Sequence, residues 1–124
     1  MKRIIASAKA PAAVGPYSQA VEAGGTLYVS GQLPINPADG AMPASVADQT
    51  RQSLTNIGAI LNEAGYSFDD VAKTCVLLTD IADFAEMNAV YAEFFTGDKP
   101  ARVCYQVSAL PKGAKVEIDA IAAK

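Results

Sequence analysis

The residues best suited to chemistry lie in the last quarter of the chain. Polar and apolar residues alternate from Ala101 to Val107, which predicts a β-strand with Arg102 and Cys104 on one face. The same alternation from Lys115 to Ile121 predicts a second strand, with Glu117 on its polar face. A guanidinium is a planar set of donors that matches a carboxylate, so the partner expected for Arg102 is either Glu117 or the carboxylate of a small acid.

A turn over Leu110 to Gly113 separates these two predicted strands, which we take to be adjacent in the sheet. If the two strands pair, Arg102 and Glu117 face the same cleft. On strand alternation alone, an arginine on a strand is more often a solvated edge residue than part of a site. A functional interpretation of Arg102 therefore needs support from the rest of the chain.

Further motifs, in a fixed order and spacing, extend over nearly the whole chain. They are Ala10 and Pro11, Gly15 to Ala20, Tyr28 to Gln32, Thr79 and Asp80 with Phe84, Met87, Asn88 and Tyr91, Pro100 to Arg102, Cys104, Leu110, and Val116 to Ile118. Together they resemble the RidA (YjgF) family of imine deaminases, and several ordered motifs are more specific than any one of them. Val103 and Tyr105 depart from many members, which have Ser and a smaller apolar residue there. Both lie on the face away from Arg102, so the departure concerns packing more than chemistry.

The resemblance implies a chorismate-mutase-like fold and a homotrimer with sites in the clefts between subunits. It also implies hydrolysis of reactive 2-imino acids, such as 2-iminobutanoate and 2-iminopropanoate, to 2-keto acids and ammonia. In this interpretation Arg102 holds the substrate carboxylate, while Glu117 orients a water molecule and accepts or relays its proton. Backbone groups of Gly31 and Cys104 complete the pocket. Its lining residues are Tyr17, Ser30, Phe84 and Asn88.

A second hypothesis is a non-catalytic module that binds a keto acid or an amino acid and has a regulatory role. Glu117 separates the two hypotheses, because a carboxylate repels an anionic ligand and a simple binder has little need of one. Cys104 lies beside Arg102, which would acidify its thiol modestly. No adjacent base makes it a nucleophile, so we expect it to line the pocket. A third possibility, the ribonuclease or translation-inhibiting activity attributed to similar proteins, is disfavoured by the acidic balance of the chain.

Composition limits the remaining possibilities. The chain has 124 residues, of which 51% are apolar, and this predicts one domain over residues 1–124. The net charge is −3 and the ten Lys and Arg residues are scattered, so we expect no nucleic-acid partner. Histidine is absent, Cys75 and Cys104 form no CxxC pair, and there is no Gly-rich phosphate loop, so we expect neither a metal nor an organic cofactor. No apolar stretch predicts a membrane span or a secretory signal, and we expect a reducing, cytoplasmic location.

The elements that must position these residues follow in the order three strands, helix, strand, helix, two strands. We expect the strands at Lys2–Ala6, Tyr17–Ala23, Thr26–Gln32, Val71–Thr79, Ala101–Val107 and Lys115–Ile121. One helix is expected from a Ser45 cap to a Gly65 stop, and another from Asp83 to Phe95. The continuous apolar middle of the fourth strand predicts a central strand that is buried on both faces.

This order predicts an α+β fold, a mixed sheet with two helices packed on one face. The other face still carries Leu27, Val29, Cys104 or Tyr105, which need burial, and a partner subunit would cover them. Asn88 borders the apolar stripe of the second helix, where a polar group needs a hydrogen-bond partner.

Overall fold

A computed structural model describes all 124 residues, which form one six-stranded sheet and two α-helices. The strands are β1 (Arg3–Ile5), β2 (Ala20–Ala23), β3 (Thr26–Gln32), β4 (Val71–Leu78), β5 (Ala101–Gln106) and β6 (Val116–Ala123), and the helices are α1 (Val46–Ala64) and α2 (Phe84–Phe94). The predicted order of elements and the α+β fold with a mixed sheet are confirmed. Neither helix is long and apolar enough to cross a membrane.

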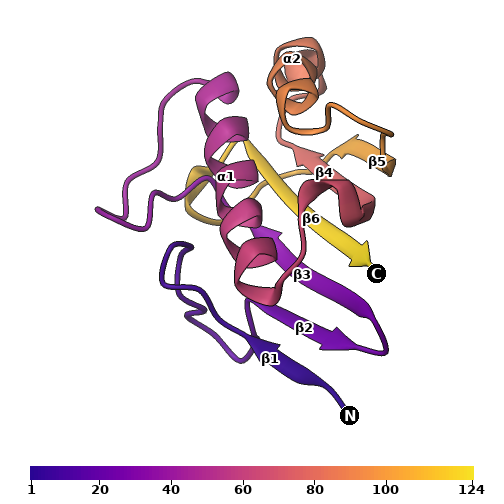
Figure 1. Cartoon of the computed structure of the whole chain (residues 1–124). Coiled ribbons are helices and arrows are strands. Elements are labelled where there is room, and N and C mark those ends of the chain that lie inside the picture. Colours follow the sequence, from indigo (N-terminus) through magenta and orange to yellow (C-terminus); the bar gives the residue numbers. More distant parts are fainter.

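The sheet has the strand order β1-β2-β3-β6-β4-β5. Every neighbouring pair is antiparallel except β4 and β5, which are parallel and are connected through α2. The prediction that the strand of Arg102 pairs with the strand of Glu117 is therefore wrong, because β4 lies between β5 and β6. The crossover through α2 carries the chain to the outer edge of β4, and β6 then fills the position between β3 and β4 (Figure 1).

Both helices pack on one face of the sheet, as predicted (Figure 1). The ends of α1 are set locally: the Ser45 side chain accepts a hydrogen bond from the Asp48 backbone, and Gly65 adopts the left-handed conformation that stops the helix. Beneath the helices, β6 contributes a fully buried row made of Val116, Ile118, Ala120 and Ala122. The most completely apolar face of any strand thus occupies the centre of the sheet.

The opposite face of the sheet has no helix over it, and we call it the open face. It exposes large apolar side chains, because Tyr28, Val103 and Tyr105 are 50%, 44% and 52% accessible. Of the four residues predicted to remain uncovered, only Tyr105 lies there. Leu27 and Val29 are buried beneath the helices, and Cys104 packs against the same core.

The expectation that β4 is buried on both faces is only half correct. Thr74, Val76 and Leu78 are buried on the helix-covered face, whereas Cys75 and Leu77 on the open face are only half-buried. The strand is central in the sheet, but within one chain nothing covers its second face. The continuous apolar run of β4 therefore has two roles: one face packs into the core, and the other forms a surface that needs a partner.

Candidate functional site

The eight predicted site residues form two separate clusters. The arginine cluster lies on the helix-covered face, at α2 and β5, and consists of Phe84, Asn88, Arg102 and Cys104. The glutamate cluster lies at the end of β3, on β6 and in the loop before β2, and consists of Tyr17, Ser30, Gly31 and Glu117.

The register of the sheet explains why the two clusters are apart. Arg102 on β5 pairs with Thr74 of β4, and Glu117 on β6 pairs with Leu77 of the same strand. Thr74 and Leu77 are three residues apart, an odd number, so their side chains point to opposite faces. The prediction that Arg102 and Glu117 face one cleft is wrong within a single chain.

Arg102 is held firmly by uncharged partners. Its Nη1 donates a 2.7 Å hydrogen bond to Asn88 Oδ1, and its guanidinium carbon lies 4.8 Å from the ring centre of Tyr91. The Phe84 ring flanks it at 5.5 Å. The two ion pairs of the chain, Arg3–Glu22 and Arg51–Glu93, lie elsewhere. The arginine thus has a fixed orientation, a charge with no counterion and N–H groups free for an anion.

A cleft of about 500 Å³ opens beside this guanidinium, between α2 and the segment that leads into β5. Its lining residues are Asn88, Tyr91, Ala92, Lys99, Pro100 and Arg102. Phe84 and Cys104 lie next to the cleft and not on its wall. Burial raises the pKa of the Cys104 thiol, and the neighbouring Arg102 charge opposes that rise only in part, so the thiol stays protonated at neutral pH.

Glu117 lies against the backbone of Gly31. A Cβ atom at position 31 would be 2.1 Å from Oε2 of Glu117, so only glycine leaves room for the carboxyl group. Burial raises the pKa of Glu117, and the nearby charge of Asp119 raises it further. A carboxyl group whose pKa lies above its ordinary value is closer to the range in which a group can both accept and return a proton at neutral pH.

Tyr17 and Ser30 join the glutamate cluster through the loop before β2. The exposed Tyr17 ring and Gly31 line a second cleft, of about 250 Å³. Ser30 Oγ donates a 2.6 Å hydrogen bond to the Ser18 carbonyl, which fixes this loop against β3. Gln19 is buried and donates to the Pro11 carbonyl at 2.8 Å, so it holds the other side of the loop.

Three contributors to this geometry were missed in the sequence. Tyr91 is one of the motif residues but not one of the predicted site residues, yet its ring supports Arg102 and its hydroxyl is fixed by Thr74 Oγ1 at 2.7 Å. Its position three residues after Asn88, on the same side of α2, was the available signal. Gln19 belongs to the motif Gly15 to Ala20, but nothing in the sequence marks its role in closing the loop before β2. Lys99 beside the cleft gave no local signal. No group of three His, Cys, Asp or Glu side chains is arranged to hold a metal ion.

Comparison with known proteins gives the family. A family model described as endoribonuclease L-PSP matches residues 7–124. A bovine protein named 2-iminobutanoate/2-iminopropanoate deaminase is 55% identical over 123 residues, which cover 98% of this chain and 90% of the relative. The chain belongs to the RidA (YjgF) family. The resemblance found in the sequence motifs is thereby confirmed.

Solved structures of similar proteins have the same fold. The YjgF gene product of E. coli superposes with a TM-score of 0.96 at 48% identity, over 98% of each chain. E. coli TdcF, solved with bound serine, superposes with a TM-score of 0.96 at 46% identity, again over 98% of each chain. The chain therefore has the complete fold of the RidA (YjgF) family, and within this fold its predicted site residues lie on two faces of the sheet.

Proposed function

We propose that this chain hydrolyses reactive 2-imino acids to 2-keto acids and ammonia. The observation that carries the proposal is the unpaired, rigidly held guanidinium of Arg102 beside an open cleft, which fits the carboxylate of a small acid. The names of relatives that are 49–55% identical over nearly the whole chain support the same activity.

The active site is formed between subunits. One chain holds Arg102 and Glu117 on opposite faces of its sheet, so one substrate reaches both only if a neighbouring subunit supplies the second residue. The exposed apolar side chains of the open face require a partner of this kind. We propose a homotrimer, the state that the family resemblance implies, in which the arginine cluster of one subunit meets the glutamate cluster of the next.

The chemistry needs only binding, orientation and proton transfer. Arg102 binds the substrate carboxylate, which places the imine carbon next to Glu117 of the neighbouring subunit. Glu117 orients a water molecule and takes its proton as the oxygen adds to the imine carbon. The carbon–nitrogen double bond becomes a single bond, and its electron pair goes to nitrogen. The protons pass to nitrogen, the remaining carbon–nitrogen bond breaks, and ammonia leaves a 2-keto acid.

The direct test is to generate 2-iminopropanoate or 2-iminobutanoate in situ with an amino-acid oxidase and to add the purified protein. We expect the imine to disappear and ammonia to appear faster than without the protein. An assembled, folded protein that does not accelerate the loss of either imine would contradict the proposal.

A second candidate function is a module that binds an amino acid or keto acid without reaction. The structure of E. coli TdcF with bound serine favours it, since that similar protein is known with an amino acid. The two functions differ in what they need from Glu117. An endoribonuclease activity, which the description of the matching family model names, is opposed by the net charge of −3 and the absence of histidine.

A further inference from the structure

The cleft beside Arg102 contains a second cation. Lys99 and Arg102 are the charged residues among its lining side chains, and both are positive. Lys99 lies three residues before Arg102, so their Cα atoms are at most about 10–11 Å apart on a fully extended chain. The cleft volume of about 500 Å³ lies within the range of small-molecule sites, and it leaves space beyond what one carboxylate occupies.

The polar side chains of this cleft offer more donors than acceptors. A guanidinium only donates, so Asn88 presents its oxygen to Arg102 and keeps both amide N–H groups for another partner. The hydroxyl of Tyr91 is already engaged with Thr74. A ligand rich in acceptors, such as a carboxylate, therefore suits this cleft best.

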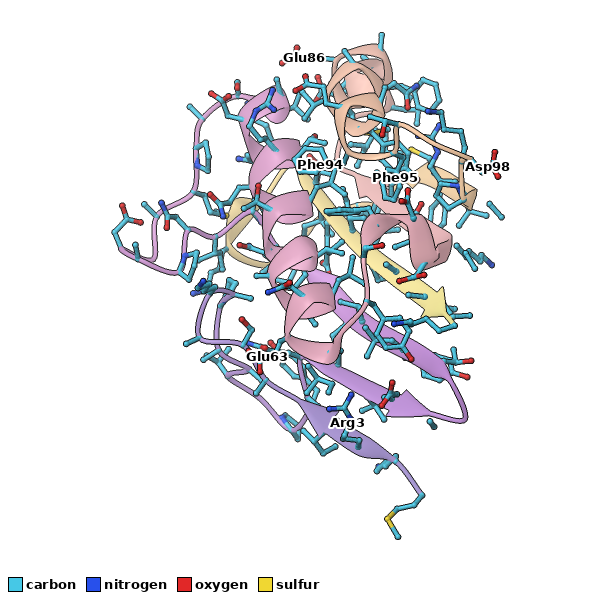
Figure 2. All side chains as sticks on the ribbon, viewed as in Figure 1. Arg3, Glu63, Glu86, Phe94, Phe95 and Asp98 are labelled. Atoms are coloured by element: carbon cyan, nitrogen blue, oxygen red, sulfur yellow. The ribbon has the colours of Figure 1, made fainter.

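Lys99 is oriented by the end of α2. Its ammonium group donates to the backbone carbonyl of Phe95, the residue that follows the helix, which leaves two N–H groups free. The ring of Phe95 is buried beside α2, whereas the neighbouring Asp98 lies exposed at the outer edge near β5 (Figure 2). No carboxylate forms an ion pair with Lys99 or Arg102 in this chain.

Among the residues that one chain contributes to the cleft, a single ligand carboxylate neutralises only one of the two cations, Lys99 and Arg102. We propose that Lys99 is a specificity-determining residue that binds a second carboxylate, so that the site prefers 2-imino and 2-keto dicarboxylic acids to their monocarboxylic counterparts. The inference rests on the proposed function, because Arg102 supplies the first carboxylate site. The carbonyl of Phe95 holds the Lys99 ammonium group at the cleft. The two free N–H groups of that ammonium bind the second carboxylate, at the end of the ligand away from Arg102.

The test compares the binding of two stable keto acids to the assembled full-length protein. Calorimetry measures the Kd of 2-oxoglutarate, a dianion, and of 2-oxobutanoate, a monoanion, at one fixed ionic strength. A charge-assisted hydrogen bond at a partly exposed site corresponds to about a tenfold preference, which we expect for the dianion. In Lys99→Met we expect this preference to fall to within about twofold, with 2-oxobutanoate affinity nearly unchanged.

Two control variants separate this role from others. Lys99→Arg keeps the charge and should keep the preference. Lys2→Met removes the same charge near β1, at the opposite edge of the sheet, and should leave both affinities unchanged. A structural role of Lys99 at the end of α2 would lower both affinities together and leave their ratio intact.

Three results would overturn the assignment: equal binding of the two acids by the unmodified protein, tighter binding of the monoanion, or equal losses for both acids in Lys99→Met. If the protein hydrolyses 2-iminopropanoate and shows no dicarboxylate preference, only the role of Lys99 fails. If neither keto acid binds and neither imine is hydrolysed, the proposed function fails with it.

Discussion

Arg102 and Glu117 lie on opposite faces of one sheet, on the two strands that flank β4. No rotation of either side chain brings them together within a chain, because the strand between them is packed with Thr74 and Val76 on one side and Leu77 on the other. A chemistry that uses both residues therefore requires at least two subunits.

Arg102→Lys is expected to reduce activity almost as much as Arg102→Ala. A lysine cannot keep the hydrogen bond to Asn88, the stacking on Tyr91 and a two-bond contact to a carboxylate at the same time. Loss of one charge-assisted bond corresponds to about a 10- to 100-fold fall in kcat/KM. Steady-state kinetics measure the effect. Arg51→Lys is the matched control. It changes an exposed ion pair with Glu93 and should leave kcat/KM unchanged.

Glu117→Gln is expected to separate the deaminase from the binding module. The amide keeps the shape of the side chain and removes the base, so turnover should fall while affinity for a 2-keto acid is retained or rises. Kinetics and calorimetry on the same preparation measure both quantities. Undiminished turnover in this variant would remove Glu117 from the chemistry.

The raised pKa of Glu117 predicts that the stability of the protein depends on pH, and Glu117→Gln removes that dependence. Burial and the Asp119 charge raise the pKa of Glu117 in the folded protein, so the folded state binds its proton more tightly than the unfolded chain does. The stability that this proton contributes is present at low pH and is lost as pH rises through the raised pKa. We expect Glu117→Gln to have a higher Tm than the unmodified protein at neutral pH, and the difference to vanish under acidic conditions. A difference that is constant with pH would contradict this account.

Gly31→Ala is expected to destabilise the protein by about 1–3 kcal/mol, the range for overpacking at a tight site, and to lower turnover. The added methyl group would overlap the carboxylate of Glu117. In a Glu117→Ala background the same change should cost much less, because the obstructing group is gone. Chemical unfolding of the four proteins measures this coupling. Gly97→Ala is the control, since a Cβ there meets its nearest neighbour at an ordinary 3.4 Å.

The open face predicts a defined assembly. Light scattering at micromolar concentration should give the mass of a trimer, and Tyr105→Glu, which puts a charge on that face, should give smaller species. Val14→Glu changes an apolar loop residue that is more exposed than Tyr105, 85% against 52%, and should leave the mass unchanged. A monomer mass for the unmodified protein would rule out the composite site.

Local signals in the sequence predict the elements and the faces of the strands. Ser45 and Gly65 set the ends of α1 through their own hydrogen bonding and backbone conformation, and strand alternation correctly separates Arg102 from Val103. The pairing of β6 with β3 and β4 depends on contacts between residues far apart in the sequence, so alternation could not supply it. The family resemblance supplies the residues of the proposed site, but it does not show that they lie on two faces.

The composite site is tested most directly by mixing two impaired variants. Arg102→Ala and Glu117→Ala chains are unfolded together in equal amounts and refolded. In random assembly each interface joins the Arg102 side of one subunit to the Glu117 side of the next, and about one interface in four has both residues intact. We predict recovery of about a quarter of the unmodified activity, which exceeds the residual activity of either variant alone. Mixed assemblies, shown by mass to contain both chains, that are no more active than the separate variants would contradict the account.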